Sequence, residues 1–245
     1  MTAAYPDLVV VSAGSGPASG TRGPVAEVPH PAVPLQVYEA ALHRASGGAP
    51  AALRFVTDCG VTRTVDVARW CADAVPGDAG ILDRCGGPTL DVGCGPGRLA
   101  AALLRRGVLA LGVDISEAAV RLAQLRGALA VRRDVFGQLP GERRWEHLVL
   151  ADGNIGIGGD PVRLLRRCRA LLAGYGTVLV ETEPAGTAAS RPVRLRLCDS
   201  DRSSEPFDWA FVAADAVPGY AAMAGLRVTE SWTEAGRWFS VLVVA

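Results

Sequence analysis

The chain contains no lysine: all 25 of its basic residues are arginine. An enzyme that uses pyridoxal phosphate needs a lysine for its Schiff base, and a P-loop nucleotide hydrolase needs a Gly-Lys-Ser/Thr sequence. The composition therefore excludes both of these classes.

Histidine is also scarce, and cysteine forms no cluster. The three histidines stand apart in the sequence, and none of the six cysteines belongs to a Cys-x-x-Cys pair. This spacing argues against a structural or catalytic metal site. With no signal for secretion in the first residues, we expect a cytoplasmic protein whose cysteines are reduced.

Long apolar runs and an excess of charge are missing as well. No apolar stretch approaches the roughly 20 residues that span a bilayer. The formal net charge is +0, without a basic block. We therefore expect neither a nucleic acid nor a membrane as partner.

What the chain does have is an apolar run that ends in a glycine-rich turn and opens into a helix. A turn without side chains before a helix N-terminus brings backbone N–H groups close to a nucleotide. The pattern G-x-G-x-x-G of dinucleotide folds is not met, because the sixth position counted from Gly93 is Arg98. Asp91 would repel a pyrophosphate and suits a cationic amino-acid moiety. The stretch, which points away from NAD, reads Leu90-Asp91-Val92-Gly93-Cys94-Gly95-Pro96-Gly97-Arg98.

This stretch resembles the first motif of the class I S-adenosylmethionine (SAM) methyltransferases. The next segment strengthens the likeness, because a helix over 99–106 and a strand over 109–113 lead to Asp114. The resemblance implies that Asp114 accepts both ribose hydroxyls of the adenosine. The alternative is a loop aspartate before a helix that Ser116 caps.

Alternating strands and helices continue to residue 183 and predict a doubly wound, Rossmann-like α/β fold. The resemblance further implies that the sheet has seven strands, mainly parallel, with an antiparallel final strand. Ligands of such sheets lie beyond the carboxyl ends of the strands. Acidic residues follow the predicted strands and should meet in one cleft: Asp114, Asp134, Asp152, Glu181 and Glu183.

The likeness covers about residues 90–183 and implies further contacts. Asp134 and Val135 would hold the adenine, unless Asp134 pairs with the preceding arginines at the surface. Residues 171–179 resemble a helix–turn–strand. The SAM-binding set implied by the motifs is Asp91, Gly93, Cys94, Gly95, Gly97, Asp114, Ile115, Asp134, Val135, Asp152 and Gly153.

Residues 152–156 occupy the place of the family's fourth motif, beside the transferred methyl group. They do not read [DN]-P-P-[YF], which argues against a methylase of nucleobase amines. Residues 153–160 contain four glycines in eight residues. Either their backbone approaches the cofactor or substrate, or they form a flexible loop before a helix.

A sulfonium methyl is already activated, so the protein must mainly orient it. A base is needed only if the acceptor has a proton to lose. Asn154 could orient an acceptor, and Glu181 is the candidate base or acceptor-binding group. We weigh Glu183 and His147 as well, although His147 lies too early in its strand and favours a structural role. Tyr38 and Trp70 either face the sulfonium through their π systems or pack as a lid.

The organisation we expect is a disordered, proline-rich extension over 1–34 and a methyltransferase domain over 35–245. Within that domain, 35–86 form a helix and a hairpin cap, 87–183 the SAM-binding core, and 184–245 an acceptor-side insert and the final strands. In the insert, Arg194 and Arg196 face solvent or bind an acidic substrate. Phe207, Trp209 and Phe211 line an aromatic-accepting pocket or anchor the insert.

We therefore expect a SAM-dependent methyltransferase acting on an O-, N- or C-nucleophile of a small molecule, with secondary metabolism as a candidate setting. One alternative is a SAM-binding protein of the same fold that runs another reaction or serves as a sensor. An NAD-linked oxidoreductase is a third and weaker reading.

Overall fold

A computed structural model describes residues 33–187 and 191–245. The extension predicted to be disordered lies outside the described residues except for its last two, and helix α1 (Pro34–Ser46) begins at the second of these. Across the described ranges, no helix combines the length and the apolar character that crossing a membrane requires.

The core is a seven-stranded sheet with the order β10-β11-β7-β6-β3-β4-β5. Strands β3 to β7 are parallel, whereas β11 runs antiparallel to both of its neighbours. The predicted Rossmann-like α/β fold is thereby confirmed. The strands are β3 (Thr89–Val92), β4 (Ala110–Asp114), β5 (Leu129–Arg132), β6 (Trp145–Leu150), β7 (Leu172–Thr182), β10 (Leu226–Glu234) and β11 (Arg237–Val244).

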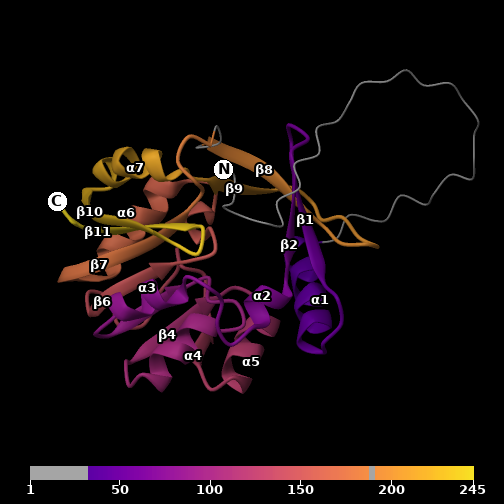
Figure 1. Ribbon diagram of the computed structural model, residues 1–245, viewed down its shortest axis with the longest axis horizontal. Helices are drawn as coiled ribbons and strands as arrows, with labels where there is room; N and C mark the ends of the chain where they lie inside the picture. The colour runs from indigo at the N-terminus through magenta and orange to yellow at the C-terminus, as the bar shows by residue number, and fades with distance from the viewer. Residues whose placement is uncertain (1–32, 188–190) are drawn as a thin grey trace, which may run out of the picture.

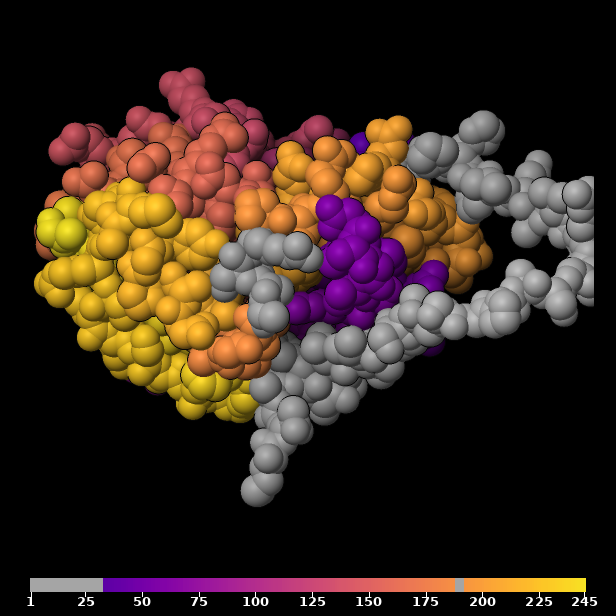
Figure 2. Space-filling view, turned by 90° about the horizontal axis from the view of Figure 1, so that it is seen from above, coloured from indigo at the N-terminus to yellow at the C-terminus, as the bar shows by residue number. Residues whose placement is uncertain are grey.

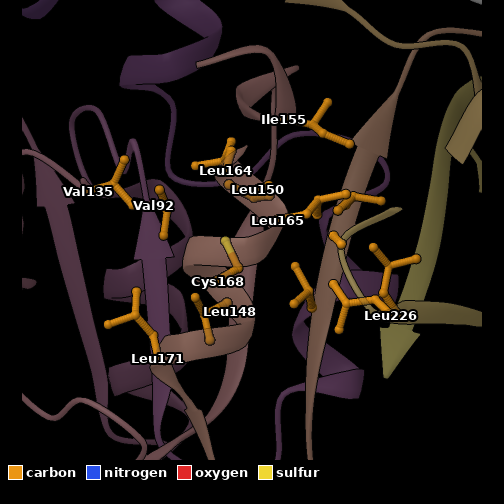
Figure 3. Packing of buried hydrophobic residues seen from close by; sticks show 14 of the residues in the cluster. Val92, Val135, Leu148, Leu150, Ile155, Leu164, Leu165, Cys168, Leu171 and Leu226 are labelled. Atoms are coloured by element: carbon orange, nitrogen blue, oxygen red, sulfur yellow. The ribbon is translucent and has the colours of Figure 1, made fainter. Parts of the chain in front are cut away.

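Helices cover both faces of this sheet (Figure 1). Because side chains alternate along a strand, Leu148 and Leu150 of β6 pack with α6 and α7, as Figure 3 shows for α6, whereas Val149 packs with α3 and α4 on the other face. The buried residues thus form two hydrophobic clusters, one on each face of the sheet, which hold the ends of the strands in position. The helices are α3 (Asp78–Arg84), α4 (Arg98–Arg105) and α5 (Glu117–Leu125) on one face, and α6 (Pro161–Leu171) and α7 (Val217–Met223) on the other.

A second sheet, which we call the cap sheet, is antiparallel and has the order β2-β1-β8-β9. The predicted hairpin forms β1 (Ala52–Thr57) and β2 (Thr62–Asp66), with α1 and the short α2 (Ala68–Cys71) beside it. The other two strands of the cap sheet follow the core strand β7 in the sequence; they are β8 (Arg191–Cys198) and β9 (Phe207–Phe211). Figure 2 shows the N-terminal segment in purple against the orange residues of this later segment.

The cap sheet has one apolar face and one polar face. Phe55 pairs with Leu197, and Leu195 with Phe207, so that these side chains share the inner face. Arg194 and Arg196 lie on the outer face, where their guanidinium groups donate to the carbonyl oxygens of residues 206 and 204. The expected solvent-facing position of both arginines is thus the one observed.

Close backbone contacts and an ion pair join the cap sheet to the core. Arg63 of β2 lies 2.6 Å from a carboxylate oxygen of Glu183 and stacks over the ring of Phe211. A Cβ on Gly156 would lie only 2.0 Å from the carbonyl oxygen of Ala210 in β9. Gly156 and Gly159 therefore admit strand β9 of the cap sheet, a role that neither sequence-based interpretation included.

The prediction of a helix–turn–strand over 171–179 is wrong. Helix α6 ends at Leu171, and β7 begins at Leu172, which already pairs with Trp145. The extra residues bulge, because the next pair joins His147 to Thr177. Gly174 and Gly176 thus lie within the strand.

Candidate functional site

A cavity of about 570 Å³ lies at the carboxyl ends of β3 to β6, between the core and the cap sheet. Its volume falls in the range of small-molecule sites. It brings together most of the predicted site residues: Tyr38, Trp70, Asp91, Gly93, Cys94, Gly95, Asp114, Ile115, Asp134, Val135, Asp152 and Asn154. Gly97, Gly153, Glu181, Glu183 and His147 are not part of this wall.

The glycine turn after β3 needs its glycines for different reasons. Gly93 has a φ of 70°, and a Cβ there would lie 2.7 Å from the amide nitrogen of Asn154. Gly97 has a φ of 78°, and its Cβ would lie 2.6 Å from that of Ala123 in α5. Gly97 therefore serves helix packing, whereas Gly93 lies in the wall of the cavity.

Asn154 holds this turn in place. Its Nδ2 donates to the carbonyl oxygens of Val92 and Gly93, both at 2.9 Å. The side chain thus joins the loop after β6 to the end of β3. This makes Asn154 a positioning residue for the turn, with its carbonyl oxygen at the cavity.

Asp114 links the turn to the end of β4. Its two carboxylate oxygens accept from the backbone nitrogens of Gly95 at 2.9 Å and of Ser116 at 2.8 Å. Burial raises the pKa of this carboxyl, and the two hydrogen bonds oppose that effect. Ser116 caps α5 by accepting from the nitrogen of Ala119. The helix cap at Ser116 is therefore present, and Asp114 also lies in the cavity wall, where its contact with a ribose stays a prediction.

Asp91 lies under the turn with a side chain almost closed to solvent. Burial raises the pKa of this carboxyl to about 7, and the nearby Arg98 guanidinium opposes the rise. A cationic partner stabilises the charged form of a buried carboxyl whose pKa is raised in this way. The site therefore favours an ammonium group next to Asp91.

Two buried arginines that the sequence analysis did not select form an ion network with three acids. Arg98 donates to Asp78 and Asp152. Arg237 donates to both oxygens of Glu181, at 2.8 and 2.7 Å, and to Asp78. Glu181 also accepts from the backbone nitrogen of Asp152. Glu181 is therefore held in a structural bidentate pair outside the cavity, and this position removes the reason to assign it a catalytic role.

Arg98 also faces the cavity. Its Nε is buried and has no hydrogen-bond partner within the described part of the chain. A buried donor of this kind is costly unless a ligand satisfies it. The wall thus offers a donor from Arg98 next to the carboxyl of Asp91, a pair that suits an amino acid's carboxylate and ammonium.

The other end of the cavity is more open and apolar. Ile115 is 55% exposed, which is unusual for a large aliphatic side chain, and Val135 is buried beside it in the same wall. Asp134 is exposed and accepts from the nitrogen of Phe136. The three side chains leave an apolar slot with a carboxylate at its rim.

Tyr38 and Trp70 enter the wall from the cap. Their rings meet edge to face, with centroids 5.8 Å apart. Burial raises the pKa of Tyr38 well above its usual value, so its hydroxyl stays neutral. The tyrosine hydroxyl lies 3.3 Å from the place of a Cβ on Gly95, so the ring closes over the glycine turn.

The two remaining candidates have structural partners. Glu183 pairs with Arg63 of the cap sheet. The Nδ1 of His147 lies 2.8 Å from the hydroxyl oxygen of Thr177, in the middle of the paired strands β6 and β7. Burial lowers the pKa of His147. These positions favour the structural reading of His147.

Sequence reasoning found only part of the cap-side wall. Phe207 and Trp209 line the cavity, as one of the two interpretations of the insert expected, whereas Phe211 does not. Phe55, Leu195 and Leu197 also line the cavity and were missed. The alternation of aromatic residues over 207–211 was a usable signal for β9, but the pairing of β1 with β8 leaves no local signal.

Comparisons with known proteins agree with this geometry. Residues 89–176 match the family model described as a methyltransferase domain. A release factor glutamine methyltransferase from Rhodospirillum rubrum is 48% identical over 61 residues, which are 23% of this chain and 18% of that enzyme. The chain thus spans less than a fifth of the length of this curated relative.

Solved structures of other proteins share the fold over most of this chain. A SAM-dependent methyltransferase from Bacteroides fragilis in complex with S-adenosyl-L-homocysteine superposes with a TM-score of 0.73. The identity is 23%, and the match covers 86% of this chain and 94% of that one. The CcbJ methyltransferase from Streptomyces caelestis gives a TM-score of 0.54 at 19% identity, over 73% and 94% of the two chains. At these identities the likeness concerns the fold.

The cavity fits SAM on its own chemistry. The unpartnered Nε of Arg98 and the raised pKa of Asp91 match the two charged groups of an amino acid. The wall next to them supplies a carboxylate at Asp114 and an apolar slot at Ile115 and Val135, as a ribose and an adenine require.

Proposed function

Because this chain carries a class I SAM-dependent methyltransferase domain and uses SAM as its cofactor, we propose that it methylates a small-molecule acceptor held under the cap sheet. The observation that carries the proposal is the single cavity shared by the glycine turn and the apolar face of the cap sheet. We also propose a cytoplasmic location, which the six free cysteines support.

We assign the donor to the core side of the cavity. Asp91 pairs with the ammonium group of SAM, Arg98 with its carboxylate, Asp114 with the ribose hydroxyls, and Asp134, Ile115 and Val135 with the adenine. Backbone groups of Gly93, Cys94 and Gly95 line the path between them. When bound, SAM supplies an activated methyl group.

The chain's own contribution is orientation and the exclusion of water. Asn154 and Asp114 fix the glycine turn, so the donor site is largely formed before binding. Tyr38 and Trp70 cover it from the cap and lower the local dielectric. Acceleration then comes from holding the acceptor in line with the methyl group.

Calorimetry with S-adenosylhomocysteine, followed by incubation with methyl-labelled SAM and small-molecule extracts, tests the proposal. We expect binding and a labelled low-molecular-weight product. Label on macromolecules alone would contradict the acceptor class, and binding without any labelled product would favour the sensor.

Replacing Asp114 with alanine should weaken S-adenosylhomocysteine binding by at least ~1.5–3 kcal/mol, the contribution of hydrogen bonds to a charged group. The loss combines the ribose contacts with the anchoring of Gly95. Calorimetry measures it, and Asp73→Ala, at a carboxylate that is 89% exposed, is the matched control. Equal affinities of the two variants would refute the ribose assignment.

The affinity for S-adenosylhomocysteine should fall as the pH decreases from 7.5 to 5.5. The pKa of Asp91 is about 7 before binding, so its carboxyl takes up a proton below that pH and loses its attraction for the ammonium group. The limiting slope is about tenfold in Kd per pH unit. Calorimetry across this range should show the trend in the wild type and a weaker, flatter profile in Asp91→Asn. A Kd that stays constant or improves at low pH would contradict the pairing.

A further inference from the structure

The cap side of the cavity is mainly apolar, and its charged member from the cap sheet is Asp208 of β9. Leu53 and Phe55 of β1, Leu195 and Leu197 of β8, and Phe207 and Trp209 of β9 line it. They come from three neighbouring strands, and the strand register places them on the same face of the cap sheet. Arg194 and Arg196 of β8 lie on the opposite face, so neither of these two guanidinium groups is part of this wall.

The aromatic members leave ring surface open to the cavity. Leu53 and Leu195 are closed to solvent, whereas Phe55, Phe207 and Trp209 are only half-buried. The rings of Phe207 and Trp209 stand edge to face, with centroids 6.3 Å apart. Rings in this arrangement present one face and one edge to a third ring.

Trp209 cannot swing away, because the core holds it from behind. Its backbone forms a bridge with Ile157, and a Cβ on Gly156 would lie 2.7 Å from its Nε1. The indole is thus fixed over the loop that follows β6, next to Asn154. A rigid ring loses little entropy when a ligand stacks on it.

We propose that the acceptor is a flat aromatic molecule, uncharged at its ring, that binds among Phe55, Phe207 and Trp209. This inference rests on the proposed function and names the acceptor class of that same site. For a phenolic acceptor, the hydroxyl proton leaves to solvent, an O–CH3 bond forms, and the S–CH3 bond breaks with its electron pair on sulfur, which yields neutral S-adenosylhomocysteine.

The test compares 2-naphthol with trans-2-decalol, which has the same carbon skeleton without the aromatic rings. Both are titrated by calorimetry into the full chain saturated with S-adenosylhomocysteine. We expect 2-naphthol to bind at least tenfold more tightly. Decalol binding as tightly as naphthol, or neither binding, would overturn the proposal in favour of another acceptor.

Variants locate the contact. Trp209→Leu and Phe207→Leu keep an apolar side chain but remove a ring, and each should weaken 2-naphthol at least fivefold while changing decalol less than twofold. Tyr175→Leu removes a ring that is 76% exposed and lies outside the cavity wall, so it should change neither Kd. An unchanged naphthol Kd in both ring variants would also overturn the proposal.

The affinity for S-adenosylhomocysteine distinguishes a wrong acceptor class from a wrong proposed function. If the wild type binds S-adenosylhomocysteine but binds 2-naphthol no more tightly than decalol, the acceptor class is wrong while the donor site stands. If the wild type does not bind S-adenosylhomocysteine, the proposed function fails together with the inference.

Discussion

Replacing Arg237 with methionine should lower the free energy of unfolding by about 3–5 kcal/mol, the range for breaking a buried ion pair from one side. Arg237 is 2% exposed and donates to Glu181 and Asp78, both almost fully buried. Without the guanidinium, Asp78 keeps its ion pair with Arg98 and Glu181 keeps the hydrogen bond from the backbone nitrogen of Asp152, but the charges of both buried carboxylates are compensated less. Urea unfolding followed by circular dichroism measures the loss.

Arg106→Met is the matched control for this variant. Arg106 pairs with Asp83, and the two side chains are 42% and 66% exposed. Exposed pairs of this kind contribute about 0–1 kcal/mol. If Arg237→Met lost no more stability than Arg106→Met, the network would not support the sheet as we describe.

Replacing Gly156 with alanine should cost about 3 kcal/mol of stability, at the upper end of the range for overpacking. The added Cβ would lie 2.0 Å from a backbone oxygen of β9 and 2.7 Å from the indole of Trp209, so the strand must move. A backbone atom cannot rotate away as a flexible side chain can. We expect the variant to lose 2-naphthol binding more than S-adenosylhomocysteine binding.

Gly174→Ala provides the comparison. Gly174 lies within β7, and a Cβ there would meet nothing within 4 Å. Its unfolding midpoint should stay close to that of the wild type. A Gly156→Ala protein as stable as Gly174→Ala, with naphthol binding intact, would show that β9 does not need this close approach.

The donor half of the site could be predicted from the sequence because its signals are local. The turn from Asp91 to Gly97 is one continuous stretch. Asp114 is the last residue of β4, and Asp134 and Asp152 each come two residues after the end of a strand. Parallel strands bring such positions to one edge of the sheet. Nothing beyond strand order was needed to place these acids around one cavity.

The other parts of the site could not be predicted, because they depend on contacts between residues that are far apart in the sequence. Glu181 resembled a catalytic acid because its partner Arg237 belongs to a different strand, and only the pairing of β7 with β11 reveals it. The sequence shows a glycine at position 156, but it does not show that β9 packs against the backbone there. The part of the acceptor wall that β1 and β8 contribute was missed for the same reason, since these strands belong to segments on either side of the core.

The pairing of Arg54 with Cys198 has a consequence for how the protein folds during synthesis. The β1–β2 hairpin emerges early, and β1 then remains an open strand edge until the ribosome has released β8. Open edges attract other chains, and contacts between remote segments form slowly. The strand that completes the substrate wall is therefore also the element that protects the nascent chain from aggregation.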